Sequence, residues 1–334
     1  MYELLARVFE KVKARASDPK IRRLAEKYGY RAYMVARYVE VLGWSGAQLL
    51  LEANEKPLTP TIRCNDYLID CGELKERLEE KGYVLEGLEF PPVGFRVLRR
   101  GIGSLGGTHE YLQGYYYIQD AASMSIAYAL TPEPSELIVD MAAAPGGKST
   151  QILQLTRDKA LLVAVEKSPR RIRSLRSHLQ RMRFTRYIVV LGDSLRVPLP
   201  TGVDRVLLDA PSTGEGIIRR DPSRKASRSL SDLSYIHETQ YKLLSRAISL
   251  VKDGGVIVYS ACSLAPEEGE FVIHRVLREH PEVTVEAHGL PATPGVTSYF
   301  GVDLDDRVAS CGRFWPHIHD TEGFFVCRLR VRRD

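Results

Sequence analysis

Short apolar runs alternate with longer amphipathic segments over the last two thirds of the chain. Six apolar runs lie at residues 135–144, 160–167, 186–193, 204–211, 254–262 and 323–331. The segments between the first five have helical spacing, most clearly at 148–155, 169–182 and 235–251. Strands that alternate with helices of this length are typical of a parallel sheet covered on both faces. We therefore predict an α/β domain over 116–334 with a doubly wound, mostly parallel sheet.

The N-terminal third has a different pattern. Apolar residues recur at helical spacing over residues 1–55, which predicts an N-terminal helical segment. Short strand-like stretches at 61–65 and 95–99 flank a charged amphipathic helix at 74–83. This arrangement predicts a small α+β module over 56–115. Pro57 and Pro60 mark the turn between the two parts.

Composition restricts the class of protein only weakly. The chain has 334 residues and a formal net charge of +5, a mildly basic balance that permits a nucleic-acid partner without requiring one. The five cysteines are scattered, with no CxxC spacing, so we expect no zinc site, no disulfide framework and a reducing cytoplasm. No apolar run approaches the ~18 residues of a membrane span, and the charged N-terminus does not resemble a signal peptide.

An acid or a thiol lies toward the end of each of the first five apolar runs. These residues are Asp140, Glu166, Asp193, Asp209 and Cys262. In an open parallel sheet, ligands bind outside the carboxyl ends of the strands, and those ends lie at one edge. The sequence therefore predicts that these five side chains surround a single ligand site.

The segment after the first run has the features of a cofactor loop. It consists of Ala142, Ala143, Ala144, Pro145, Gly146, Gly147 and Lys148. The two glycines let the backbone approach a ligand closely, and a helix beginning near Lys148 offers free amides. Glu166 follows roughly 20 residues later, where an acid binds ribose hydroxyls in nucleotide-binding folds.

Three nucleotide cofactors fit these features to different degrees. A nicotinamide dinucleotide requires a GxGxxG spacing that the loop lacks. The stretch 142–149 misses the P-loop spacing by one residue, and Pro145 removes an amide from the phosphate cradle. S-adenosylmethionine uses the loop for its amino-acid end and the acid for its ribose. The residues favour S-adenosylmethionine and leave a P-loop nucleotidase as the alternative.

Several segments, in order, resemble the Nop/Sun family of RNA cytosine-5 methyltransferases. They are 117–123, 140–148, Asp193, 209–211, 216–220, 259–268 and 323–326. The resemblance implies a class I, Rossmann-like methyltransferase fold with an RRM-like RNA-binding module. It also implies that residues 142–148, Glu166, Arg171, Asp193 and Asp209 bind S-adenosylmethionine. By the same resemblance, Asp209 binds the target cytosine and Cys262 is the nucleophile.

The chemistry explains why this reaction uses a thiol. Carbon 5 of cytosine does not attack a sulfonium methyl until a thiolate adds to carbon 6, which places electron density at carbon 5. The thiolate is the reactive form of cysteine. We expect the helix that begins near Pro266 to lower the pKa of Cys262, with Lys148 adding positive charge, although Glu267 and Glu268 oppose this effect.

The sequence departs from the family at one reactive position. The family usually has a second cysteine after Asp-Ala-Pro, associated with product release, and Ser212 occupies that position here. The serine suffices for release, or it is an engineered change that traps the RNA adduct, or the protein binds RNA and turns over slowly. We adopt the first interpretation as the hypothesis to test, with Ser212 counted among the catalytic residues.

RNA is the predicted partner. A base attacked at carbon 6 from its ring face must leave its stack. We expect Arg63, Arg219 and Arg220 to contact the RNA, with tRNA favoured over rRNA because the chain is compact. A DNA cytosine methyltransferase places its nucleophile in a Pro-Cys dipeptide, whereas this chain has Pro211-Ser212. We also expect a cytoplasmic monomer without a metal ion.

Overall fold

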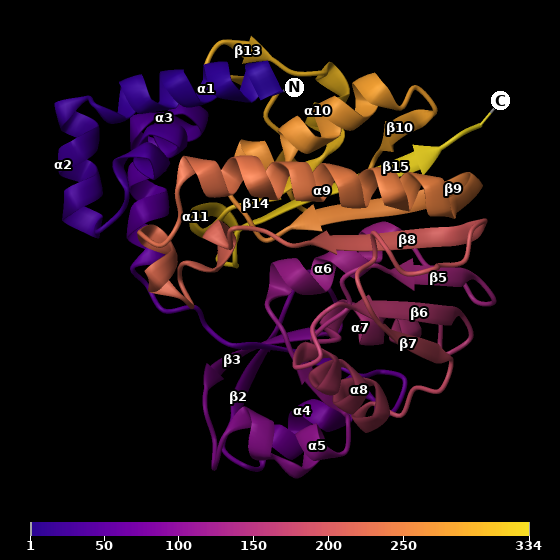
Figure 1. The fold of residues 1–334 in the computed structure, drawn as a ribbon. Coiled ribbons are helices and arrows are strands. Elements are labelled where there is room, and N and C mark those ends of the chain that lie inside the picture. Colours follow the sequence, from indigo (N-terminus) through magenta and orange to yellow (C-terminus); the bar gives the residue numbers. More distant parts are fainter. Residues whose placement is uncertain (1, 334) are drawn as a thin grey trace.

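The computed structural model describes residues 2–333. A large sheet runs through the centre of the molecule, with three N-terminal helices at one end and a small α+β unit at the other (Figure 1). The order of the large sheet is β11-β14-β15-β9-β8-β5-β6-β7, and β10 pairs with β15. Its strands are β5 (Leu137–Asp140), β6 (Leu161–Glu166), β7 (Tyr187–Leu191), β8 (Val203–Ala210), β9 (Val251–Ala261), β10 (Val283–Glu286), β11 (Thr293–Pro294), β14 (Gly312–Phe314) and β15 (Phe324–Val331).

Helices cover both faces of this sheet, as the doubly wound pattern predicts. Helices α6, α7 and α8 contribute to one buried apolar cluster, and α9 and α10 contribute to the other. The bounds are α6 (Ala121–Leu130), α7 (Gly147–Leu155), α8 (Arg171–Arg181), α9 (Leu230–Leu250), α10 (Glu270–Glu279) and α11 (Pro316–His319). Single-turn 3-10 helices lie at Leu105–Gly107, Glu215–Ile217, Pro222–Lys225, Pro266–Glu268 and Asp306–Ser310.

The sheet is mixed, which corrects the expectation of a mostly parallel one. Strands β7, β6, β5, β8 and β9 are parallel neighbours. Strand β15 is antiparallel to β9, and β10 and β14 are antiparallel to β15. Residues 315–323, which join β14 to β15, are too few for the crossover of about a dozen residues that a parallel connection needs.

The N-terminal residues form three helices, α1 (Tyr2–Ala16), α2 (Pro19–Tyr28) and α3 (Ala32–Asn54). Helix α3 reaches the rest of the molecule through Arg37, whose side chain is 1% exposed. Arg37 forms ion pairs with Glu215 and with Glu267, the latter at 3.3 Å. These pairs bind α3 to segments about 200 residues away. None of the helices within residues 2–333 is long and apolar enough to cross a membrane.

A four-stranded antiparallel sheet forms the small unit, in the order β2-β3-β1-β4. Its elements are β1 (Thr61–Cys64), α4 (Cys71–Glu79), β2 (Val84–Gly87), β3 (Gly94–Arg99), α5 (His109–Leu112) and β4 (Tyr116–Ile118). Strand β4 belongs to this sheet although it follows residue 115, where we placed the module boundary. Elsewhere, β12 (Ser298–Tyr299) and β13 (Val302–Asp303) form a separate pair.

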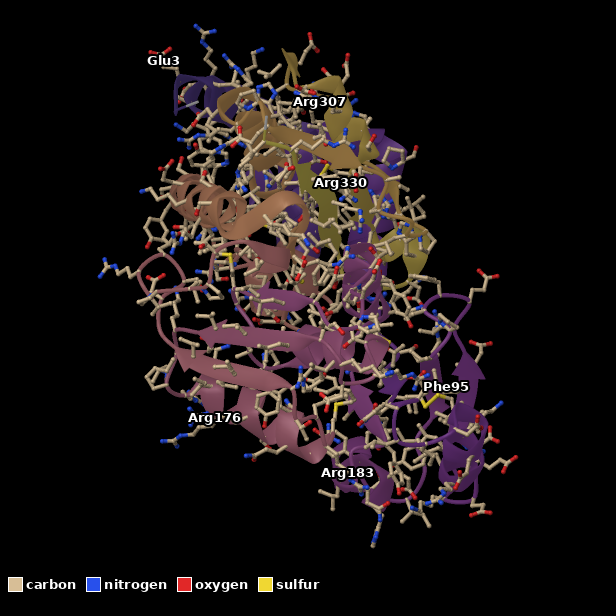
Figure 2. All side chains as sticks on the ribbon, turned by 90° about the vertical axis from the view of Figure 1, so that its right-hand side faces the viewer. Glu3, Phe95, Arg176, Arg183, Arg307 and Arg330 are labelled. Carbon is tan, nitrogen blue, oxygen red and sulfur yellow. A yellow bond between two sulfur atoms is a disulfide. The ribbon has the colours of Figure 1, made fainter. Side chains whose placement is uncertain are left out.

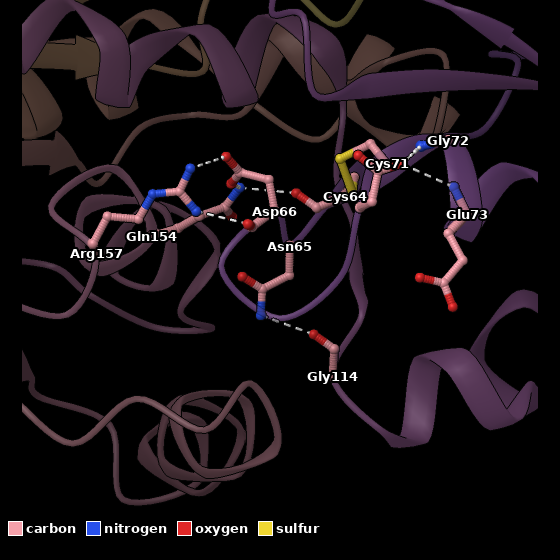
Figure 3. Close-up of a disulfide and its surroundings, with 10 residues drawn as sticks. Cys64, Asn65, Asp66, Cys71, Gly72, Glu73, Gly114, Gln154 and Arg157 are labelled. Carbon is pink, nitrogen blue, oxygen red and sulfur yellow. Dashed lines mark hydrogen bonds and ion pairs between the residues drawn. A yellow bond between two sulfur atoms is a disulfide. The ribbon is translucent and has the colours of Figure 1, made fainter.

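Two disulfides correct the expectation of unpaired cysteines. Cys64 ends β1 and Cys71 begins α4, and the turn between them brings their Cα atoms to 5.8 Å (Figure 3). Cys311 bonds to Cys327 because the antiparallel register of β14 and β15 places them opposite each other. Spacing along the sequence does not reveal pairs that a turn or a strand register creates. Cys262 is the free cysteine of the described residues.

Candidate active site

Two adjoining cavities open at the carboxyl ends of the parallel strands. The larger, of about 860 Å³, is lined by Glu166, Arg171 and Asp193. The smaller, of about 420 Å³, is lined by Lys148 and Cys262. Both cavities are lined by Ala142, Ala144, Arg171, Asp209 and Ser212. The two cavities therefore adjoin near the end of β8, so that ligands bound in both would lie next to each other.

The predicted cofactor loop lies between these cavities. Ala142, Ala143, Ala144, Pro145, Gly147 and Lys148 line one or both of them. Asp140, at the end of β5, holds the loop by accepting hydrogen bonds from Ser149 Oγ at 2.6 Å and from the Ala142 amide at 3.3 Å. Gly146 lines neither cavity. It precedes α7 with a φ of +111°, and an added Cβ would lie 3.2 Å from Leu175, so its role is in the turn.

The acids of the larger cavity lie as the strand-end pattern predicts. Glu166 is 3% exposed, and its Oε1 accepts a hydrogen bond from the Ser168 amide at 2.8 Å. Arg171 approaches the other Glu166 oxygen at 3.7 Å and also donates to the Ala144 carbonyl. Asp193 lies across the same cavity. The parallel register brings Glu166 and Asp193 together from the ends of two neighbouring strands, β6 and β7.

Lys148 points into the smaller cavity. Its Nζ donates to Asp209 Oδ2 at 2.8 Å and to Ser123 Oγ at 3.0 Å. The other Asp209 oxygen accepts a hydrogen bond from Ser260 Oγ, also at 2.8 Å. This geometry disfavours the P-loop alternative, because the ammonium that would bind a nucleotide phosphate is held by a carboxylate.

The Cys262 thiol lies in the same cavity, within reach of a carboxylate and a carbonyl. Its Sγ is 4.0 Å from Glu322 Oε2 and 3.5 Å from the Gly323 carbonyl oxygen. Burial raises the pKa of the Cys262 thiol well above its ordinary value, and the negative charges of Glu322 and Asp209 raise it further. In the free protein the thiol is therefore held protonated.

This direction corrects the expectation that a helix N-terminus lowers the thiol pKa. Residues Pro266–Glu268 form only a single 3-10 turn, and α10 does not begin until Glu270. Glu267 and Glu268, expected to oppose the helix, are fully buried and face other partners. Glu267 pairs with Arg37, and Glu268 accepts a hydrogen bond from Ser263 Oγ at 2.6 Å.

Glu322 is a site residue that the sequence reasoning missed. Its side chain is 5% exposed, and burial raises its pKa to about 7, with the neighbouring Asp120 adding to the shift. Arg220 lies 3.1 Å from Glu322 Oε1, and the Glu322 amide donates to Asp120 Oδ2 at 3.1 Å. Glu322 precedes an antiparallel strand, whose start lies at the edge where the parallel strands end. A search limited to the residues at the ends of parallel strands does not find such a residue.

Ser212 occupies the position expected from the sequence. Its Oγ donates a hydrogen bond of 3.2 Å to the Cys262 carbonyl oxygen, and both residues line the smaller cavity. The hydroxyl therefore lies beside Cys262.

Two of the three arginines expected to contact RNA have buried side chains in this structure. Arg63 is fully buried and donates to the Gly147 carbonyl at 2.6 Å and to Thr150 Oγ1 at 2.7 Å. The Arg219 side chain is 4% exposed and pairs with Asp320 at 2.8 Å. Of these three arginines, only Arg220 lines the smaller cavity. The sequence shows that an arginine is charged, but it does not show whether the folded protein buries the side chain.

Two further arginines line the smaller cavity beside Arg220. Arg224 and Arg228 each donate to the Thr213 carbonyl at 3.3 Å. Both belong to the polar stretch that follows the Asp209 loop. The polar composition of this stretch is the feature of the sequence that marks these arginines as candidate site residues. The smaller cavity thus combines a thiol, four carboxylates and a cationic rim.

Known proteins are similar to this chain in sequence and in fold. Residues 127–330 match the family described as 16S rRNA methyltransferase RsmB/F. The 25S rRNA (cytosine-C(5))-methyltransferase nop2 of Schizosaccharomyces pombe is 35% identical, over 92% of this chain and 52% of that protein. The probable ribosomal RNA small subunit methyltransferase B of Bacillus subtilis is 29% identical, over 94% of this chain and 69% of that protein. The chain thus spans about half the length of the yeast relative.

A solved structure agrees over nearly the whole fold. The structure of a methyltransferase homolog protein from Pyrococcus horikoshii superposes with a TM-score of 0.85 and 34% identity, covering 94% of this chain and 99% of that one. The family match spans more than half of the described residues, and its segments carry the thiol, the acids and the loop described above. The chain therefore belongs to the RsmB/F (Sun/Nop) family of S-adenosylmethionine-dependent RNA methyltransferases.

Proposed function

We propose that this chain methylates carbon 5 of cytosine in RNA, with Cys262 as the nucleophile. One observation carries the proposal: Cys262, Asp209 and Lys148 line a cavity that adjoins the cavity of the cofactor residues. A pyrimidine in the first cavity would lie beside a methyl donor in the second. Such juxtaposition of two reactants supplies much of the catalysis of a transfer reaction.

The larger cavity fits S-adenosylmethionine by the chemistry of its donors. The Glu166 carboxylate suits the two ribose hydroxyls, and Asp193 suits the adenine amine. The loop 142–148 and Arg171 would hold the amino-acid end. When bound, this cofactor supplies an electrophilic methyl group on a sulfonium sulfur.

The remaining chemistry belongs to the side chains of the smaller cavity. The Cys262 sulfur bonds to carbon 6, and electron density moves to carbon 5, which takes the methyl group. Asp209 accepts a hydrogen bond from the cytosine amino group while Lys148 Nζ, 2.8 Å from Asp209 Oδ2, holds the carboxylate in position. Water takes the carbon 5 proton, and the sulfur leaves as the ring double bond returns.

Glu322 provides an acceptor for the thiol proton. As the sulfur–carbon bond forms, the proton passes from Sγ to Glu322, 4.0 Å away in the free protein, and it returns when the sulfur leaves. This transfer adds no net charge to a buried site, whereas ionisation of the thiol alone would. A carboxyl group with a pKa of about 7 is matched to this exchange near neutral pH.

Replacing Glu322 with glutamine is expected to lower the catalytic rate about 10²-fold. The base acts when ionised, so the wild-type rate should rise as pH increases through about 7, and the variant should lose this rise. The pH dependence of kcat for both proteins measures this effect. Glu26→Gln, at an exposed position on α2, serves as the control. An unchanged pH profile in Glu322→Gln would exclude Glu322 as the acceptor.

Ser212 is expected to support product release. We predict that the wild-type protein turns over repeatedly, and that Ser212→Cys changes the multiple-turnover rate by less than about tenfold, since the hydroxyl already lies beside Cys262. Incubation with cofactor and RNA, followed by denaturing electrophoresis, checks this prediction. A wild-type complex that survives denaturant without free methylated RNA would contradict it, most clearly if Ser212→Cys restored release.

Bisulfite sequencing tests the proposed function and identifies the substrate. Unmodified total RNA is incubated with S-adenosylmethionine and either wild-type protein or Cys262→Ala. The names of the yeast and Bacillus relatives support rRNA, whereas the preference for tRNA rests only on the compactness of the chain. We expect one or a few cytosines to gain protection with the wild type alone. If no cytosine does so in either class of RNA, the proposal fails.

A further inference from the structure

One segment concentrates positive charge far beyond the rest of the chain. Residues 167–186 contain eight of the 47 lysines and arginines and none of the 42 acidic residues. A chain of net charge +5 would be net negative without them. The eight residues are Lys167, Arg170, Arg171, Arg173, Arg176, Arg181, Arg183 and Arg186. The segment spans α8 and its flanks. It is separate from the polar stretch that carries Arg220, Arg224 and Arg228.

Packing explains only one side of α8. Its apolar residues Ile172, Leu175 and Leu179 are buried in the core. On the other side, Arg173 and Arg176 are exposed and three residues apart, so they lie on the same side of the helix. Arg183 follows the end of the helix. Figure 2 shows the side chains of Arg176 and Arg183 pointing away from the body of the molecule.

These arginines have no acidic neighbours. No carboxylate of residues 2–333 lies within 4.0 Å of Arg173, Arg176 or Arg183, and the segment 167–186 contains no acidic residue of its own, so no ion pair neutralises these three charges. Uncompensated like charges repel and destabilise the folded state. An anionic partner would relieve that repulsion.

The segment that carries these arginines begins at the active site. At the start of α8, Arg171 lines both cavities. Near the end of α8, Arg181 donates to the Tyr111 carbonyl and, at 3.1 Å, to the Tyr116 carbonyl, both in the small α+β unit. The segment that carries the exposed arginines thus begins at the catalytic cleft and ends at that unit.

We propose that Arg173, Arg176 and Arg183 bind backbone phosphates of the substrate RNA outside the target nucleotide. This inference rests on the proposed function, because it assumes that the target base enters the smaller cavity. Guanidinium groups suit phosphate oxygens, and such contacts position a nucleic acid without reading its sequence. The exposed residues between the arginines, Ser174, Ser177 and Gln180, are polar, which suits a sugar-phosphate backbone better than a membrane surface.

Removing the three charges tests this surface. The variant Arg173→Gln, Arg176→Gln, Arg183→Gln is compared with Arg7→Gln, Arg22→Gln, Arg23→Gln, which removes three exposed charges from α1 and α2. The probe for binding is a radiolabelled RNA stem–loop with a cytosine in its loop, titrated at several salt concentrations. Each lost phosphate contact should reduce the slope of log affinity against log salt by about 0.7 to 0.9, so by about 2 in total.

For the α8 variant we expect RNA affinity at least about tenfold weaker at moderate salt, since three phosphate contacts are lost. KM for RNA should rise with it, whereas kcat at saturating RNA and the affinity for S-adenosylmethionine should not change. The α1/α2 variant should behave as wild type. An unchanged salt slope in the α8 variant would overturn the inference, as would a loss of binding only to anionic vesicles or to an acidic protein.

The measurement of RNA affinity does not depend on catalysis. If the wild type methylates no RNA but the α8 variant alone loses RNA affinity, the proposed function fails and the phosphate surface stands. If the wild type methylates RNA and both variants bind it equally well, the function stands and the surface fails.

Discussion

Replacing Cys262 with alanine should reduce methyl transfer by about 10⁴-fold or more, the size of effect seen when a covalent nucleophile is removed. Without a sulfur to add at carbon 6, carbon 5 does not become nucleophilic. The loss should appear in kcat, measured by transfer of a labelled methyl group to the RNA identified by bisulfite sequencing.

Cofactor binding separates this effect from a damaged fold. Cys262 does not line the larger cavity, so calorimetry should give Cys262→Ala the wild-type affinity for S-adenosylmethionine. Cys262 is only partly buried, and the hydrogen bond that its thiol donates to the Gly323 carbonyl at 3.5 Å is a weak sulfur contact, so thermal stability should change little. A variant that kept a tenth of the wild-type rate would contradict the assignment of Cys262 as nucleophile.

Replacing Asp209 with asparagine should lower kcat by about 10³-fold, because preorganised electrostatic groups in a dry site contribute effects of this size. The carboxylate accepts hydrogen bonds from Lys148 and Ser260 and faces both cavities. An amide would leave the Lys148 charge without its partner and would weaken the contact with the cytosine amino group.

The same strand provides a matched control. Asp204, near the start of β8, also pairs with a lysine, Lys252, and accepts the Leu137 amide at 2.7 Å. Asp204→Asn removes an equivalent charge pair at the opposite end of the strand from the cavities. We expect it to keep the wild-type kcat and to lose only some thermal stability. Equal losses of kcat in both variants would show that the Asp209 effect is structural.

The parallel part of the fold could be predicted from the sequence because its signals are local. Each of the first five apolar runs carries an acid or the thiol toward its end, and the parallel register places Asp140, Glu166, Asp209 and Cys262 at one edge without further information. The cofactor loop follows from the same rule, since it connects the first strand to its helix.

The missed features depend on contacts between distant segments. Glu322 enters the site through an antiparallel strand, and Arg63 is buried by the docking of the small unit on α7. The disulfide between Cys311 and Cys327 depends on the register of β14 and β15. The monomeric state and the cytoplasmic location stay predictions. The positive charge of residues 167–186, by contrast, is evident in the sequence, and the structure adds that Arg173, Arg176 and Arg183 are exposed, with no carboxylate of residues 2–333 within 4.0 Å.

Trapping the covalent intermediate tests the central claim most directly. An RNA that carries 5-fluorocytosine at the target position has no carbon 5 proton to lose, so the sulfur cannot leave after methyl transfer. With S-adenosylmethionine, the wild type should form a complex that survives denaturing electrophoresis, and mass spectrometry of its peptides should place the RNA on Cys262. Cys262→Ala should form none. The absence of a complex on an RNA that the wild type methylates, or attachment at another residue, would contradict the account.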